Sequence, residues 1–140
     1  MNSFGHFQYS LVIKEHHLDG FGHVNNATYL QLLEEARWEV VSPKGFSFYD
    51  VQKKKTGPTI LEIQIRFMKE LRLREKITIH TQGIDYPGKV GTLKQWITNA
   101  NDEICTEALL KIGLFDVAER KLIKPTPEWL QAIGAPPTPA

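Results

Sequence analysis

Hydrophobic positions repeat first with the period of a β-strand and then with the period of an α-helix. The first segment alternates apolar and more polar residues, as a strand with one buried face does. Its apolar members are Phe7, Tyr9, Leu11 and Ile13. From residue 26 onward apolar residues recur every three or four positions, which predicts a long amphipathic helix. Asn25 or Asn26 suits its N-cap, and Ser42-Pro43 ends the pattern. The apolar face of this helix holds Tyr29, Leu32, Leu33, Ala36 and Val40.

Most of the chain beyond a polar connector at residues 44–57 is strand-like. Four alternating or β-rich segments are separated by turn-forming residues. They contain Leu61, Ile63, Ile65 and Phe67; Ile77 and Ile79; residues 92–98; and residues 104–117. In the last strand we expect one face to hold Ile104, Ala108, Leu110, Ile112 and Leu114. A short helix should start at Thr126-Pro127, because proline is tolerated at the first helical position. The proline-rich residues 135–140 are expected to form a disordered tail.

The order of strand, long helix and about four strands predicts an α+β fold. One antiparallel sheet and one long helix must bury their apolar faces against each other, and a sheet wrapped around a central helix does this. We expect a single domain over residues 1–134. Such a sheet keeps free edges, which favours pairing with further copies of the chain as a homodimer or homotetramer.

Composition narrows the class of protein. With 41% hydrophobic and 24% charged residues, the chain has the composition of a globular protein. A formal charge of +1 implies no general attraction to nucleic acid or to an anionic membrane. No apolar run approaches the roughly 20 residues that span a bilayer, so we expect no membrane insertion. The N-terminus does not read as a signal peptide, and the single Cys105 excludes an internal disulfide. We therefore expect a cytoplasmic protein.

The stretch from Asp19 to Arg37 holds the strongest candidate chemistry. It places a carboxylate and two glycines, Gly20 and Gly22, immediately before the long helix. Helix N-termini carry free N–H groups and a partial positive charge. A loop bearing Asp19 beside such an end suits a substrate that develops an oxyanion. Taken alone, however, an Asp-Gly pair is more often only a turn.

The same stretch resembles a known family. The pattern D-x-x-G-x-V-x-x-x-x-Y-x-x-x-x-E-x-A-R is filled by Asp19, Gly22, Val24, Tyr29, Glu34, Ala36 and Arg37. It resembles the 4-hydroxybenzoyl-CoA thioesterase-like family of hotdog-fold acyl-CoA thioesterases, and the likeness covers about residues 7–130. The resemblance implies a hotdog fold, in which an antiparallel sheet wraps one long central helix. It also implies a dimer or tetramer with sites at the subunit interface.

The resemblance further implies that the chain is a thioester hydrolase, which converts an acyl-CoA to free acid and CoA without a cofactor. The family's aspartate acts as nucleophile or general base and matches Asp19. The backbone N–H that polarises the thioester carbonyl matches about Asn26. Supporting or substrate-binding roles then fall to Gly22, His23, Val24, Asn25, Tyr29, Glu34 and Lys89.

Several of these residues also have a purely structural interpretation. His23 would orient Asp19 or touch the substrate, or else only pack within the loop. Tyr29 is first a core residue, and lining of an acyl pocket is its secondary role. Glu34 either pairs with Arg37 three residues later or acts as the base, as a helix glutamate does in related hotdog enzymes.

Other polar clusters carry weaker signals. The basic segments 53–55 and 120–121 are solvated loops or attachment points for CoA phosphates, as is Lys89. The histidines at 16, 17 and 23 lie near Asp19 but match no zinc signature, so we expect no metal. Cys105 has no basic neighbour in its strand and is not expected to be a nucleophile. The tryptophans at 38, 96 and 129 are interpreted as packing residues.

Two alternatives to an acyl-CoA thioesterase remain at this point. A thioesterase of the same fold could act on an acyl carrier protein, although the net charge shows no compact basic face. A non-catalytic protein of the same fold could bind acyl-CoA without turnover.

Overall fold

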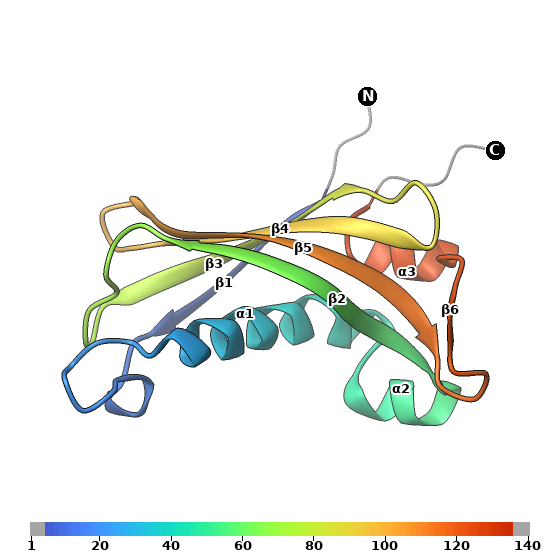
Figure 1. Cartoon of the computed structure of the whole chain (residues 1–140), viewed down its shortest axis with the longest axis horizontal. Helices are drawn as coiled ribbons and strands as arrows, with labels where there is room; N and C mark the ends of the chain where they lie inside the picture. The colour runs from blue at the N-terminus through green and yellow to red at the C-terminus, as the bar shows by residue number, and fades with distance from the viewer. Residues whose placement is uncertain (1–4, 136–140) are drawn as a thin grey trace.

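An antiparallel sheet curves around one long helix in the computed structural model, which describes residues 5–135 (Figure 1). The strands are β1 (His6–Val12), β2 (Thr56–Phe67), β3 (Lys76–Asp85), β4 (Val90–Thr98), β5 (Ile104–Asp116) and β6 (Lys121–Ile123). The α-helices are α1 (Asn26–Val41), α2 (Phe48–Lys54) and α3 (Pro127–Ala132). Single 3-10 turns precede and follow α1, at Glu15–His17 and Ser42–Lys44.

The sheet has the strand order β1-β3-β4-β5-β2, and every pair of neighbours is antiparallel. Strand β6 adds to the end of β5, so β1 and β2 form the two edges. Helix α1 lies against the concave face and packs more closely on β1 and β3 than on β2. This arrangement confirms the predicted α+β fold with a sheet wrapped around a central helix.

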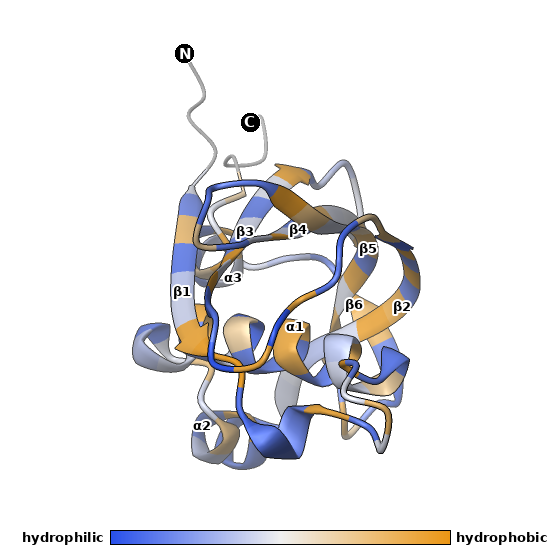
Figure 2. Cartoon of the chain, turned by 90° about the vertical axis from the view of Figure 1, so that its left-hand side faces the viewer, coloured by the Kyte–Doolittle hydropathy of each residue, from blue (hydrophilic) through white to orange (hydrophobic). Residues whose placement is uncertain are grey.

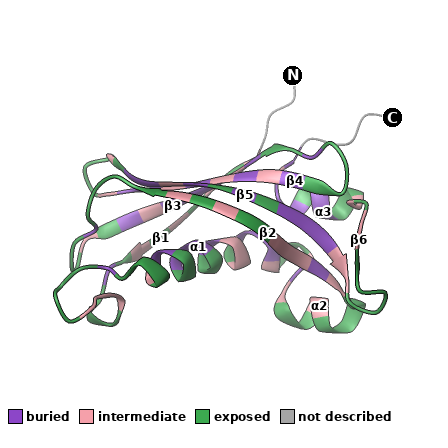
Figure 3. Cartoon of the chain, viewed as in Figure 1, coloured by how far each residue is buried: buried purple, intermediate pink, exposed green. Residues whose placement is uncertain are grey.

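The core forms between α1 and the concave face of the sheet. Figure 2 looks along α1 and shows hydrophobic segments on the strands around it, and Figure 3 shows the buried positions that alternate along them. All five residues of the predicted apolar helix face are buried, and Val41 joins them. The helix ends as expected, because Pro43 allows only a 3-10 turn and Gly45 then adopts a left-handed conformation with φ 93°.

One fully buried amide ties the helix to the sheet. The Gln95 side chain of β4 donates from Nε2 to the Leu33 carbonyl oxygen and to Thr81 Oγ1, both at 3.0 Å. Its Oε1 accepts from Arg37 Nη1 at 3.0 Å. Both amide hydrogens and the amide oxygen therefore have partners, which a polar group with no solvent exposure requires.

The predicted polar connector at residues 44–57 is wrong in part, because it contains α2 and the start of β2. Ser47 and Asp50 form a capping box in which Ser47 Oγ accepts from the Asp50 N–H at 3.1 Å. Val51 packs on Gly57, where a Cβ would lie 2.6 Å from the valine Cγ1. A local cap and one apolar contact are thus enough to order this short helix.

Two register shifts overturn the strict alternation expected in the strands. A shift between Ile60 and Glu62 leaves Leu61 exposed, so Ile60 rather than Leu61 shares the inner face with Ile63. A second shift, opposite Ile97 and Thr98, turns Ile104 outward. An extra residue in one strand moves the later side chains of that strand to the opposite face of the sheet. A prediction that assumes strict alternation misses this change.

The C-terminal part of the chain agrees only partly with the sequence prediction. Helix α3 starts as predicted, with Thr126 Oγ1 accepting from the Trp129 N–H at 3.1 Å. Residues 104–117 are not the last strand, because the three-residue β6 follows. Ala135, assigned to a disordered tail, is buried and donates its N–H to the Leu130 carbonyl at 2.9 Å. The rest of the predicted tail, residues 136–140, lies outside the described residues.

Replacement of the buried amide should destabilise the fold. In Gln95→Leu, the Arg37 guanidinium and the Thr81 hydroxyl lose their partner, and an unsatisfied buried polar group costs about 1–3 kcal/mol. We expect urea unfolding to show at least that loss in the free energy of unfolding. Gln64→Leu, on the exposed face of β2, is the matched control and should change stability little. Equal effects of the two substitutions would contradict the role assigned to Gln95.

Candidate active site

Asp19 organises the loop that leads into α1. Its Oδ1 accepts from the backbone N–H groups of Phe21 at 2.8 Å and His23 at 3.1 Å. Its own N–H donates to the His23 carbonyl at 2.7 Å, which closes the loop on itself. Gly22 has φ +82°, a left-handed conformation that a residue with a Cβ rarely adopts, so a glycine is required here.

These hydrogen bonds also set the charge of Asp19. Donation by the Phe21 and His23 N–H groups lowers the pKa of the carboxyl below its ordinary value, because both bonds favour the ionised form. Within the described residues, Oδ2 has no hydrogen-bond partner. Asp19 therefore presents one free carboxylate oxygen at neutral pH.

The first turn of α1 leaves a single free donor. Asn25 is the N-cap, and its side chain accepts from the Ala27 N–H at 2.8 Å. Its carbonyl accepts from the N–H groups of Thr28 at 2.9 Å and Tyr29 at 3.3 Å. Over the part of the chain that the structure describes, the Asn26 N–H has no acceptor. The Asn26 N–H is thus the donor that remains available to an acceptor at the positive end of the helix.

A shallow depression of about 260 Å³ opens at this end of the helix. It is lined by His23, Val24, Asn26, Tyr29 and residues 67–70. His23 Nδ1 lies 2.7 Å from Glu70 Oε1, which joins the Asp19 loop to the segment after β2. The Tyr29 and Phe67 rings meet edge to face, with centroids 4.9 Å apart. Asp19 is not in the lining but borders it through its hydrogen bonds to His23.

The structure thus brings together most of the residues that the sequence singled out. Asp19, Gly22, His23 and Asn25 shape the loop and the cap, while Val24 and Tyr29 are buried beneath. Sequence reasoning did not assign the other wall, which is formed by Phe67, Met68, Lys69 and Glu70. These residues follow a predicted strand, and no local signal indicates that its end meets the start of α1.

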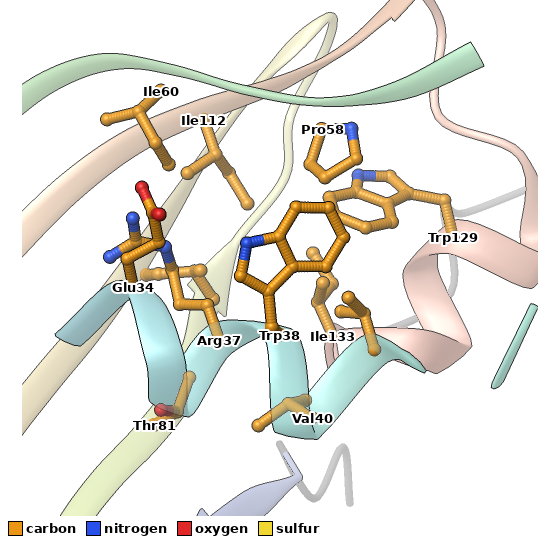
Figure 4. A pocket seen from close by; sticks show the side chains of 12 residues that line it. Glu34, Arg37, Trp38, Val40, Pro58, Ile60, Thr81, Ile112, Trp129 and Ile133 are labelled. Atoms are coloured by element: carbon orange, nitrogen blue, oxygen red, sulfur yellow. The ribbon is translucent and has the colours of Figure 1, made fainter. Parts of the chain in front are cut away.

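Glu34 lies in a different place from Asp19. With Arg37 and Trp38 it lines a cavity of about 110 Å³ beneath the C-terminal half of α1 (Figure 4). The expected Glu34–Arg37 ion pair is not among the salt bridges of the described residues, and Arg37 bonds to Gln95 instead. Burial lowers the pKa of Arg37, and the charge of Glu34 opposes this effect only in part.

Lys89 is also remote from the depression in this chain. It lies in the β3–β4 turn, at the end of the sheet near α3 and away from the Asp19 loop (Figure 1). There it lines a hollow of about 670 Å³ together with Lys124. Of the basic residues at 53–55, Lys54 donates to the Gly45 carbonyl at 3.0 Å and so stabilises the approach to α2.

The remaining sequence candidates have mainly structural surroundings. Burial raises the pKa of the Cys105 thiol, which does not suit a nucleophile. Trp129 is buried and donates from Nε1 to the Tyr86 hydroxyl at 3.0 Å. Among residues 5–135, no three His, Cys, Asp or Glu side chains gather as metal ligands would. Nor does any helix in that range have the length and apolarity needed to cross a membrane.

The fold and the comparisons with known proteins identify the chain as a hotdog-fold thioester hydrolase. The chain belongs to the Thioesterase-like superfamily, whose family model matches residues 12–134. It is 31% identical to the long-chain acyl-CoA thioesterase FadM of Escherichia coli (strain K12) over an alignment of 117 residues. That alignment covers 83% of this chain and 88% of FadM.

Two solved structures show the same fold at lower identity. The protein SAV2348 from Staphylococcus aureus, in complex with CoA, superposes with a TM-score of 0.84 at 15% identity, over 98% of this chain and 90% of that one. The DHNA-CoA thioesterase from Staphylococcus aureus has a TM-score of 0.79 at 21% identity, over 91% and 87% of the two chains. The hotdog fold implied by the sequence resemblance is therefore confirmed.

The cap assignment can be tested with two neighbouring asparagines. Asn25→Ala removes the side-chain acceptor for the Ala27 N–H, and loss of such a cap lowers stability by about 0.5–2 kcal/mol. Asn26→Ala removes only an exposed side chain and keeps the backbone N–H, so its free energy of unfolding should stay close to that of the wild type. Chemical denaturation of both variants measures the difference. A larger loss in Asn26→Ala would show that the cap has been placed on the wrong residue.

Proposed function

We propose that this chain hydrolyses an acyl-CoA to the free acid and CoA at the depression beside the start of α1. The observation that carries the proposal is the free Asn26 N–H at the positive end of the helix, next to a loop that holds Asp19 ionised. The FadM relative is named for acyl-CoA hydrolysis, and the structurally similar SAV2348 was solved with CoA; both support this substrate class.

The Asn26 N–H would stabilise the reacting carbonyl. A thioester oxygen seated on this donor gains negative charge as the tetrahedral intermediate forms, and the helix dipole favours that charge. Removal of one such donor in an enzyme typically costs about 2.7–4 kcal/mol of transition-state stabilisation. Because the donor is a backbone group, side-chain substitutions at this position leave it in place.

Asp19 would supply the attacking group in one of two ways. As general base, its free oxygen takes a proton from water while the water oxygen bonds to the carbonyl carbon, and CoA leaves as the thiolate. As nucleophile, the carboxylate oxygen bonds to that carbon itself, the C–S bond breaks, and water then hydrolyses the mixed anhydride. Both routes require the ionised form that the loop stabilises.

We also propose that the working unit is a homodimer or homotetramer. Within residues 5–135, no strand pairs with the outer edge of β2, and Leu61 and Phe67 of this strand have 47% and 48% of their surfaces accessible. Pairing along this edge would cover them. In such an assembly Lys89, which lies far from the Asp19 loop of its own chain, would serve only the site of another subunit.

Loss of the free carboxylate should abolish turnover. Asp19→Asn retains an oxygen that accepts from the Phe21 and His23 N–H groups but removes the negative charge. We expect kcat to fall at least about a hundredfold, the usual size of an acid–base contribution. The assay is free-thiol release from short, long and aromatic acyl-CoAs. Asp85→Asn, at the exposed end of β3, is the charge-matched control and should keep wild-type rates.

Each outcome of that assay discriminates between functions. Near-wild-type rates in Asp19→Asn would exclude Asp19 as the reacting group. If the wild type is inactive on every acyl-CoA, acyl carrier protein thioesters become the next substrates. Acyl-CoA binding without turnover would instead indicate a non-catalytic role.

The activity should resist acid down to unusually low pH. Because the pKa of Asp19 is lowered, its ionised form persists below the ordinary aspartate value of about 3.9, and activity is lost only as pH falls through the lowered value. The acid limb of kcat/KM should therefore lie below about pH 4. The loss of thioester ultraviolet absorbance measures it, with circular dichroism to show that the chain stays folded. An acid limb near neutral pH in the folded protein would indicate a different titrating group.

A further inference from the structure

The cavity beneath the C-terminal half of α1 takes no part in the chemistry described above. Its walls come from α1, the inner face of the sheet and α3, and most of its lining residues are apolar. Figure 4 shows the polar ends of Glu34 and Arg37 on one side and the indole rings of Trp38 and Trp129 on the other. The cavity is thus mainly apolar, and the polar groups of Glu34 and Arg37 lie on the side nearest the N-terminal half of α1.

Half-buried apolar side chains of β2 lie along the path from the depression to this cavity. Helix α1 packs on β1 and β3, so the inner face of β2 is only partly covered. Ile63 and Ile65 remain half-buried there, and Phe67 is 48% exposed. The helix and β2 run in opposite directions, because Tyr29 meets Phe67 at one end while Trp38 and Ile60 share the cavity at the other.

The length of this path matches a fatty acyl chain. The twelve residue-to-residue steps from Asn26 to Trp38 rise about 18 Å along the helix, at about 1.5 Å per step. Carbon–carbon bonds of about 1.5 Å at about 111° advance about 1.25 Å per carbon, so about 14 carbons span that distance. A chain whose carbonyl sits on the Asn26 N–H would therefore place its methyl end at Trp38.

We propose that the cavity is the terminal subsite for a long, unbranched acyl chain and that Trp38 limits the length of the chain. This inference rests on the proposed function, because it takes the Asn26 N–H as the position of the carbonyl. The acyl chain lies along Ile65 and Ile63, passes Glu34 and Arg37, and ends among apolar side chains. One Arg37 donor, Nη1, is bonded to the Gln95 amide oxygen beside this path.

Trp38 is the side chain that best fits a length limit. It lies on α1 at the far end of the path, and its half-buried indole stands between the helix and the β2 side of the cavity. Trp129, on α3, is almost fully buried and is held by its bond to Tyr86, so it forms a fixed wall. Removal of the Trp38 indole extends the space beyond the proposed methyl position without touching the Asp19 loop.

The test is a chain-length profile of kcat/KM with octanoyl-, dodecanoyl-, tetradecanoyl- and octadecanoyl-CoA. Trp38→Ala should raise the octadecanoyl-to-tetradecanoyl ratio about tenfold or more, since one methylene that fits or fails to fit a pocket is worth about 10–200-fold. Trp96→Ala removes an equally large, half-buried indole from the outer face of the sheet, where it stacks on His80, and should leave the ratio unchanged. Trp38→Phe provides a milder variant if Trp38→Ala does not fold.

Dissociation constants of non-hydrolysable acyl-CoA thioethers, measured in parallel, separate the two proposals. Failure of the wild type to turn over any acyl-CoA would overturn the proposed function, while thioether affinity would still report on the cavity. Affinity that rises up to about 14 carbons and extends to longer chains in the Trp38 variant supports the subsite. Profiles that coincide in wild type and Trp38 variants, or a uniform loss at every length, would overturn it.

Discussion

The position of α1 on the sheet depends on one buried amide. Gln95 binds the backbone of the helix at Leu33, the Arg37 side chain one turn later and Thr81 on β3. Apolar packing alone is not directional, whereas these three hydrogen bonds fix the position of α1 along its axis and its rotation about that axis. Both sites that we propose depend on the position of α1, because its first turn lies beside Asp19 and its last turns cover the cavity.

Features that depend on neighbours in the sequence were predicted well. The cap of α1 at one of two neighbouring asparagines, its buried stripe, its stop at Pro43 and the Thr126 cap of α3 each arise within a few residues, and the structure selects Asn25 for the first cap. The capping box of α2 was also present in the sequence, as a serine three residues before an aspartate, but its polar surroundings suggested a connector. The bulges at Leu61 and near Cys105 have no comparable local signal, since they are set by the pairing of strands.

The candidate site shows the same division. The Asp19 loop and the helix start are contiguous in the sequence, so their proximity could be predicted. The link between His23 and Glu70 joins segments 47 residues apart and follows only from the closure of the sheet around α1. Arg37 illustrates the opposite error. Spacing along a helix made Glu34 the expected partner, but the fold places Gln95 against Arg37, and the neutral amide oxygen of Gln95 accepts from Arg37 Nη1 inside the protein.

The way Asn25 closes the first turn of α1 has a consequence for what the site attracts. An open helix start offers several N–H groups and binds anions such as free phosphate with little discrimination. Here Asn25 accepts from the Ala27, Thr28 and Tyr29 N–H groups, so among the residues that the structure describes the Asn26 N–H is the one of this turn without an acceptor. A single donor is a poor trap for a multiply charged ion but is sufficient for one carbonyl oxygen. Free phosphate would therefore gain little at the proposed reaction centre, and the anionic groups of a substrate would have to be bound elsewhere on the protein.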